Sequence, residues 1–196
     1  MSDASERRFA PDGRPQGWFS EEECAAYAEA VGMTPGGKVL EVGTWLGRSL
    51  SAIMPTAIKH NTDVTVVDTW QGSIGAQTKK AIDAGLKPFS AFKANMEFLG
   101  FWGKFSYHTM PSVAAAKHYT DGFFDLVFID ANHDYEAVKA DILAWMPKVK
   151  PGGLLLGHDY YTTTANPHPG VRQAVKELCL PDRVDDSLWW KEIPKA

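Results

Sequence analysis

The stretch VLEVGTWLGRSL, residues 39–50, begins as a buried strand, breaks at Gly43 and reaches Gly47, where a helix can start. A glycine after a strand lets the backbone turn sharply. A glycine at the start of the next helix lets a ligand approach the amide groups at the positive end of that helix. The Gly-x-x-x-Gly spacing differs from the Gly-x-Gly-x-x-Gly spacing of dinucleotide sites. The stretch therefore predicts a strand-turn-helix unit and disfavours a diphosphate as its ligand.

Two acidic residues belong to the first two predicted strands. Glu41 lies within the first strand, and Asp68 ends the second, DVTVVD at 63–68. A carboxylate in the first strand repels a diphosphate but attracts an ammonium or sulfonium group. Asp68 is suited to the two hydroxyls of a ribose. S-adenosylmethionine carries a ribose, an ammonium and a sulfonium and no phosphate, so the two acids favour this ligand.

The chain alternates apolar runs of strand length with stretches of helical period, which is typical of a parallel sheet covered by helices. We therefore predict an α/β fold with a doubly wound, mostly parallel, Rossmann-like sheet and helices on both faces. The length of 196 residues and the hydrophobic content of 44% favour a single domain, 18–196, after a flexible N-terminal arm, 1–17. Strands are expected at 38–42, 63–68, 103–109, 123–130, 150–159 and, antiparallel, 186–193, and helices at 20–32, 47–59, 87–100, 135–149 and 170–178.

Three local signals concern these helices. Ser20 and Glu23 have the spacing of a capping box at the start of the first helix. Pro55 lies within the predicted helix 47–59 and is expected to end or kink it. In the helix 135–149, acidic residues are expected at its start and on its solvated face, namely Asp134, Glu136 and Asp141.

Composition excludes several classes of partner. The formal net charge of −4 gives no attraction to a phosphate backbone, so we expect no nucleic-acid partner. No run of 18 apolar residues occurs, so we expect no membrane association. Cys24 and Cys179 lack metal-ligand spacing and fit a reducing cytoplasm, so a cytoplasmic protein is predicted. Trp189, Trp190 and the N-terminal arm can support a homodimer or complete the core of the monomer.

Four motifs in order resemble the class I S-adenosylmethionine-dependent methyltransferases. They are VLEVGTWLGRS, VVDTW, FDLVFIDANHDYEAVKADILAWMPKVKPGG and LLLGHDY, within roughly residues 18–178. The Glu-x-Gly-x-x-x-Gly-x-Ser form and the block IDANHDYEAV are similar to small-molecule O-methyltransferases of the catechol and macrocin types. The resemblance implies S-adenosylmethionine as cofactor and a small hydroxylated molecule, such as a sugar, polyol, phenol or natural product, as methyl acceptor.

The resemblance also implies roles for particular positions. By position, the methionine end of the cofactor is implied to lie against Glu41, Gly43, Gly47 and Ser49, and the ribose against Asp68. Trp70 and Ser112 are implied to lie near the adenosine, and Asp130 borders the cofactor where the fourth strand ends.

The ends of the fourth and fifth predicted strands carry the candidate catalytic groups. Asp130 ends one strand, and His158 and Asp159 end the other, so the three are expected to face each other across a cleft. One alternative is a divalent cation, magnesium or manganese, held by Asp130, Asp159 and His158, which lowers the pKa of the acceptor hydroxyl. The other is His158 or His133 as general base, oriented by the two aspartates. The remaining histidines have no motif around them and are expected to be structural or on the surface: His60, His108, His118 and His168.

Two other classes of function stay open at this point. A nicotinamide-dependent oxidoreductase uses a similar sheet, but the phosphate-binding spacing and a Tyr-x-x-x-Lys set do not occur in this sequence. A non-catalytic module that binds S-adenosylmethionine would keep Glu41 and Asp68 without using the acceptor-side groups. The sequence favours the methyltransferase.

Overall fold

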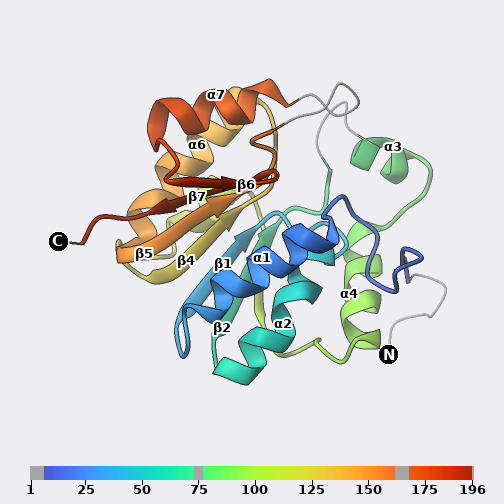
Figure 1. The fold of residues 1–196 in the computed structure, drawn as a ribbon. Helices are drawn as coiled ribbons and strands as arrows, with labels where there is room; N and C mark the ends of the chain where they lie inside the picture. The colour runs from blue at the N-terminus through green and yellow to red at the C-terminus, as the bar shows by residue number, and fades with distance from the viewer. Residues whose placement is uncertain (1–6, 73–76, 162–167, 196) are drawn as a thin grey trace.

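Seven strands form one sheet in the computed structural model, which describes residues 7–72, 77–161 and 168–195. Their order across the sheet is β3-β2-β1-β4-β5-β7-β6 (Figure 1). The strands β1 to β5 pair in parallel, whereas β7 runs antiparallel to both β5 and β6. In chain order the strands are β1 (Lys38–Val42), β2 (Asp63–Asp68), β3 (Ser106–Thr109), β4 (Phe124–Ile129), β5 (Val149–Gly157), β6 (Arg183–Asp185) and β7 (Leu188–Glu192).

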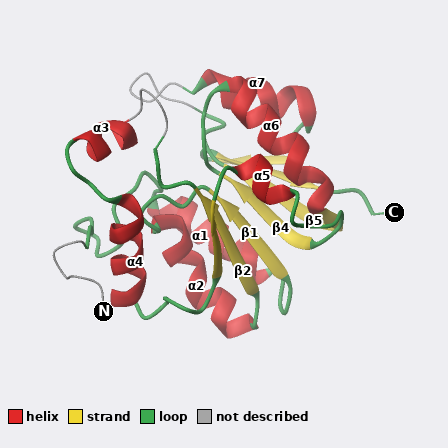
Figure 2. Cartoon of the chain, turned by 180° about the vertical axis from the view of Figure 1, so that it is seen from behind, coloured by secondary structure: helices red, strands yellow, loops and turns green. Residues whose placement is uncertain are grey.

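Helices cover both faces of the sheet, as Figures 1 and 2 show from opposite sides. One face carries α1 (Glu21–Gly32), α2 (Arg48–His60) and α4 (Pro88–Phe98), and the other carries α5 (Ser112–Ala116), α6 (Tyr135–Trp145) and α7 (Pro169–Leu178). The short helices α3 (Gln77–Asp83) and η2 (Met146–Lys148) complete the set for the described residues. This arrangement confirms the predicted doubly wound α/β fold. Within the described ranges, no helix has the length and apolar character that crossing a membrane requires.

The alternation of side chains along β1 sends its residues into two separate cores. Val39 packs in the core under α1, α2 and α4, whereas Leu40 and Val42 pack in the core under α5, α6 and α7. Because successive strand residues point to opposite faces, Glu41 faces the same helices as Val39. The strand is thus buried on both sides, and a carboxyl group lies inside one of its cores.

The C-terminal strands complete the sheet of the monomer. Trp189 and Trp190 of β7 are 1% and 5% exposed, so both belong to the core of this chain. The ring of Trp189 lies against β5 at Gly157, where an added Cβ would come within 2.4 Å of a ring carbon. Of the two roles expected for these tryptophans, the structure supports completion of the core, and a homodimer stays a prediction.

Two local sequence signals, the capping box of α1 and the proline within α2, had different outcomes. Ser20 and Glu23 form the predicted capping box at the start of α1. The prediction that Pro55 ends its helix is wrong, because α2 continues to His60 with Pro55 inside it. Pro55 lies on the exposed side of α2, where water can reach the carbonyl that loses its N–H partner.

The described part of the N-terminal segment, residues 7–19, packs against α2 and α4. The Arg48 side chain holds it through Nε, which donates to the Phe19 carbonyl at 2.5 Å, and through an ion pair of 2.6 Å with Asp12. The buried Asn95 accepts a hydrogen bond of 2.8 Å from the Arg8 amide. These contacts bring the end of the segment to the carboxyl edge of the sheet.

At Gly43 the backbone after β1 lies so close to the backbone after β4 that an added methyl group should destabilise the protein. Gly43 has φ 86°, and an added Cβ would lie 2.1 Å from the Asp130 carbonyl oxygen. We expect Gly43→Ala to lower the free energy of unfolding by at least about 3 kcal/mol, because backbone must move at a positive φ. The measurement is urea denaturation.

Gly100→Ala is the matched control for this substitution. Gly100 has φ 73° but open space around it, so only the backbone strain applies, about 1–2 kcal/mol. Equal losses in the two variants would contradict a steric constraint at Gly43.

Candidate functional site

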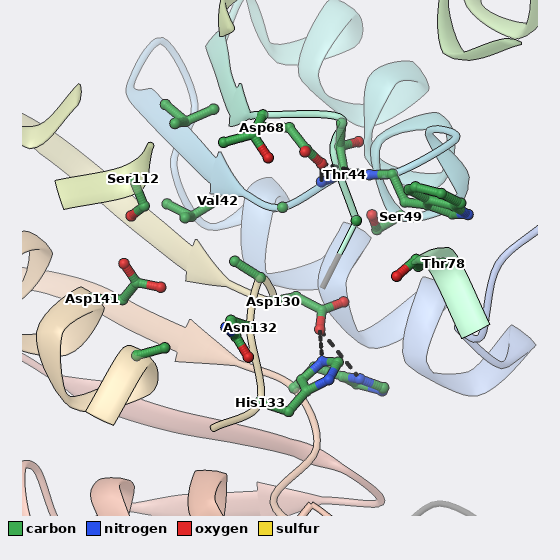
Figure 3. Close-up of a pocket in the computed structure, with 18 of the residues that line it drawn as sticks. Val42, Thr44, Ser49, Asp68, Thr78, Ser112, Asp130, Asn132, His133 and Asp141 are labelled. Carbon is green, nitrogen blue, oxygen red and sulfur yellow. Dashed lines mark hydrogen bonds and ion pairs between the residues drawn. The ribbon is translucent and has the colours of Figure 1, made fainter. Parts of the chain in front are cut away.

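A cavity of about 650 Å³ opens at the carboxyl ends of β1, β2, β4 and β5. Its wall includes the turn after β1, the ends of β2, β4 and β5, helices α5 and α6, and the end of the N-terminal segment. Figure 3 shows Asp130 and His133 in one part of this cavity and Ser112 with Asp141 in another, with Asp68 and Thr44 above them. Of the predicted site residues, the following line the cavity: Gly43, Ser49, Asp68, Ser112, Asp130, His133, His158 and Asp159.

Three of the predicted cofactor contacts, Glu41, Gly47 and Trp70, lie outside the cavity wall. Gly47 sits against α4, where an added Cβ would lie 2.5 Å from the Met96 methyl carbon. Trp70 is 4% exposed and packs with its ring 5.0 Å from that of Phe92, while its Nε1 donates to the Trp45 carbonyl at 2.8 Å. The prediction of a Trp70 contact with the adenosine is therefore not supported, because the ring belongs to the aromatic core beside α4. Trp45, between the two glycines of the turn after β1, lines the cavity.

Glu41 lies beneath the cavity and does not reach its surface. Its side chain is fully buried, and Oε1 accepts a hydrogen bond of 2.8 Å from the Ser49 hydroxyl. Oε2 makes no hydrogen bond to a described residue, although the hydroxyls of Tyr27 and Thr44 lie nearby. Burial raises the pKa of Glu41 to about 8, only partly offset by the neighbouring hydroxyls. The expected fixed anion is thus a neutral carboxyl at pH 7 in the ligand-free protein.

Asp68 joins the end of β2 to the turn after β1. One carboxylate oxygen accepts the amides of Thr44 and Trp45, both at 2.9 Å, and the other accepts the Trp70 amide at 2.7 Å. Burial raises the pKa of Asp68, and these amide hydrogen bonds partly offset the effect. Asp68 therefore shapes the turn as well as facing the cavity, where its remaining acceptor capacity can serve ribose hydroxyls.

The predicted catalytic residues come together in one cluster. His133 Nε2 lies 2.9 Å from Asp159 Oδ2 and 3.6 Å from Asp130 Oδ1. His158 Nδ1 lies 3.4 Å from Asp159 Oδ2 and 3.7 Å from Asp130 Oδ1. Asp159 has φ 60°, a left-handed conformation that aspartate tolerates better than most residues and that places its carboxylate between the two rings.

Glu23 completes this cluster from α1, although its place in the sequence predicted only a capping role. One of its carboxylate oxygens accepts the Ser20 amide at 2.8 Å, and the other lies 2.9 Å from His158 Nε2. Both side chains are buried, at 6% and 8% exposure. With Nε2 bound to Glu23, His158 turns Nδ1 toward the two aspartates.

The neighbouring carboxylates raise the pKa of both histidines. Burial opposes the charge on His133, but Asp130 and Asp159 outweigh it and raise its pKa to about 10. Burial likewise opposes the charge on His158, and Asp130, Asp159 and Glu23 hold its pKa well above the usual value. The two histidines in turn hold the pKa of Asp159 below its usual range, despite burial. The cluster is a self-compensated set of acids and imidazolium groups.

Two further residues have positions that differ from expectation. Asp141, expected on the solvated face of its helix, is 5% exposed and lines the cavity. His168, expected to be structural or on the surface, also lines the cavity, with its ring 4.1 Å from that of His133. Their sequence neighbourhoods give no signal for this, because each placement follows from how α6 and α7 pack.

Two sets of ligand atoms in the described residues are close enough to share a metal ion. Asp130, His158 and Asp159 form one set, as predicted for a cation, and His133, Asp159 and His168 form the other. In each set the atoms lie within 4.8 Å of one another. The mixed nitrogen and oxygen donors suit manganese or another transition ion at least as well as magnesium.

Sequence comparison connects this cavity to a protein family. Residues 40–160, more than half of the chain, match the model of a family described as a methyltransferase domain. Uncharacterized protein y4gI of Sinorhizobium fredii is 26% identical over 140 residues, a match that covers 62% of this chain and 13% of that protein. The chain thus spans only a small part of the length of this relative.

Solved structures share the fold at low sequence identity. A cofactor-bound structure of Rv0187 from MTB has a TM-score of 0.67 and 17% identity, over 93% of this chain and 84% of that chain. The O-methyltransferase NovP has a TM-score of 0.63 and 16% identity, over 92% and 84%. CalS11, a calicheamicin methyltransferase, has a TM-score of 0.60 and 16% identity, over 89% and 80%. At these identities the likeness concerns the fold.

The buried carboxyl of Glu41 makes stability depend on pH in a defined direction. Its pKa rises from the usual 4.5 to about 8 in the folded protein, so the folded chain binds more protons than the unfolded chain between these pH values. The Glu41 contribution to stability therefore falls as pH rises through this window. Glu41→Gln keeps an oxygen for the Ser49 hydroxyl and lacks the titration. We expect its stability relative to wild type to rise by about 3.5 kcal/mol between pH 5 and pH 8.

Urea denaturation of the two proteins at several pH values measures this difference. Glu136→Gln, on the exposed side of α6, is the control and should follow the wild-type curve. Parallel curves for wild type and Glu41→Gln would show that Glu41 is already ionised in the folded protein.

Proposed function

The chain belongs to the methyltransferase-domain family, and from this premise we propose that it transfers the methyl group of S-adenosylmethionine to a hydroxyl of a small molecule. The observation that carries the proposal is one cavity that holds both a ribose-type acid, Asp68, and the cluster of Asp130, His133, His158 and Asp159. The first group is suited to the donor and the second to an acceptor hydroxyl. The family match removes the support for a nicotinamide-dependent oxidoreductase.

The cavity fits the donor better than it fits a diphosphate. Four aspartates line it, namely Asp68, Asp130, Asp141 and Asp159. Arg48, a cation on the wall, is engaged by Asp12 and by backbone carbonyls of the N-terminal segment. Thr44 lines the cavity at the turn after β1, and Glu41 lies beneath this turn, so an ammonium group can be received here close to that carboxyl. A neighbouring cation would favour the ionised form of Glu41.

S-adenosylmethionine supplies an electrophilic methyl group on its sulfonium. The side chains of the protein position the acceptor hydroxyl and provide the charges around it. Transfer is an in-line displacement, so the acceptor oxygen has to be held about 3 Å from the methyl carbon and has to lose its proton. Asp130 ends β4 at the border between the donor side and the histidine cluster. The carboxylates raise the pKa of both His133 and His158, which favours an orienting and charge-compensating role over that of a general base.

The donor set also fits a divalent cation, which we include in the proposal. Asp130, His158 and Asp159 would hold the ion, with His133 beside them, and the ion would lower the pKa of the acceptor hydroxyl. Glu23 binds His158 Nε2 and thereby leaves Nδ1 for the cation, an arrangement common around metal-bound histidines.

Turnover is tested by the release of S-adenosylhomocysteine. We expect release that depends on a hydroxylated acceptor from a panel of phenols, catechols, sugars and polyols. Treatment with chelator should reduce the rate at least about tenfold, and manganese or magnesium should restore it. Unchanged turnover after chelation would remove the cation from the proposal. Binding of S-adenosylmethionine without turnover on any acceptor would support the non-catalytic alternative.

Two substitutions should separate the two parts of the cavity. Asp159→Asn is expected to lower kcat by about 100-fold or more and to change the affinity for S-adenosylhomocysteine less than about threefold. Asp68→Asn is expected to weaken that affinity by about tenfold or more, because a charged acceptor is lost. Calorimetry and initial rates give both quantities, and Asp134→Asn, on the surface, serves as control. The assignment is wrong if both variants lose affinity equally.

A further inference from the structure

The part of the cavity that holds Ser112, apart from the histidine cluster in Figure 3, contains a buried acid that the proposed chemistry does not use. Asp141 of α6 is 5% exposed and lines the cavity together with Ala137 and Ala140 of the same helix. These positions lie one helical turn apart and therefore share a face. The two alanines are small and leave room in front of the carboxylate. Figure 3 shows Asp141 near Ser112 and away from Asp130 and His133.

The Asp141 carboxylate is poorly compensated by the protein. No lysine or arginine in the described ranges forms an ion pair with it, and its described polar neighbour is the Ser112 hydroxyl. That hydroxyl already accepts a hydrogen bond of 2.7 Å from Trp145 Nε1. A carboxylate can accept about four hydrogen bonds, and a buried one that lacks them is destabilising. The arrangement calls for a hydrogen-bond donor from a ligand.

The surroundings of Asp141 define the shape and polarity of that ligand. The apolar residues that line the cavity include Val42, Val67, Met110, Pro111, Val113 and Ala140, and the polar side chains that Figure 3 labels around Asp141 are Ser112 and Asn132. Such walls accept a flat, weakly polar ring that presents a donor at one edge. Asp68, the ribose-type acid, lines the same cavity between this region and the turn after β1.

We propose that Asp141 selects the base of the methyl donor by accepting a hydrogen bond from the 6-amino group of adenine. This inference rests on the proposed function, because it takes S-adenosylmethionine as the ligand of the cavity. The amino group carries two N–H donors and no acceptor, so it matches a carboxylate. A purine without this group offers the carboxylate no donor at that position. Asp141 thus acts in binding specificity and takes no part in methyl transfer.

Calorimetric titration with two ligands tests this role. One ligand is S-adenosylhomocysteine, and the other is its analogue with unsubstituted purine in place of adenine. Wild type should bind the analogue about 10- to 100-fold more weakly, because a charge-assisted hydrogen bond is lost in a buried site. Asp141→Leu should weaken binding of S-adenosylhomocysteine by a similar factor and change analogue binding less than about threefold. The discrimination between the two ligands should therefore collapse.

Asp141→Asn covers the case in which the leucine variant does not fold. Its amide oxygen still accepts a hydrogen bond but without charge, and its amide N–H can donate to a ring nitrogen of the analogue. We expect discrimination to drop at least about threefold in this variant. Glu136→Gln, on the exposed side of the same helix, should retain wild-type discrimination, and thermal unfolding checks the fold of each variant.

The outcomes separate this inference from the proposed function. Unchanged discrimination in the Asp141 variants, with S-adenosylhomocysteine still bound, would overturn the role of Asp141 and leave the methyltransferase proposal intact. Equal binding of the two ligands by wild type would overturn it as well. Wild type that binds neither ligand would contradict the proposed function and this inference with it.

Discussion

The close approach of β1 and β4 at their carboxyl ends is the constraint on which the site depends. Gly43 faces the backbone of Asp130 at a distance that leaves no space for a side chain. Because the two strands meet there, the chain after each must turn away, one segment toward α2 and the other toward α6. The space between the diverging segments is the cavity. The same contact fixes the backbone of Asp130, the residue that links the turn after β1 to the histidine cluster.

The acidic residues of the site differ in charge because each carboxyl group has different hydrogen-bond donors and cations around it. Glu41 is buried without a cation and retains its proton at neutral pH. Asp68 is held by backbone amides, and Asp159 by two imidazolium rings. Asp141 has the Ser112 hydroxyl as its described polar neighbour and is the least compensated of the aspartates that line the cavity. Burial raises its pKa to about 6. A ligand that brings donors or positive charge therefore gains most at the turn after β1 and at Asp141.

Several residues of the site combine structural and chemical roles. Glu23 starts α1 through the capping box and fixes the ring of His158 across 135 positions of sequence. Asp68 shapes the turn that it shares with the ligand space. A substitution at either position changes local structure and site geometry together, so binding and rate must be measured separately from stability.

The sequence by itself determined the elements of the fold whose signals are local. Strands buried on both faces, the capping box at Ser20 and the glycine at position 43 report backbone conformation and side-chain alternation, which need no knowledge of neighbours. The ends of β4 and β5 also fixed the predicted meeting of Asp130 and Asp159, since parallel strands end at one edge. Only the tertiary structure decided that Glu41 lies beneath the cavity, that Trp70 joins the aromatic core, and that Asp141 and His168 face the ligand space. Those outcomes depend on which face of each element packs against a distant partner, and that packing sets burial and charge together.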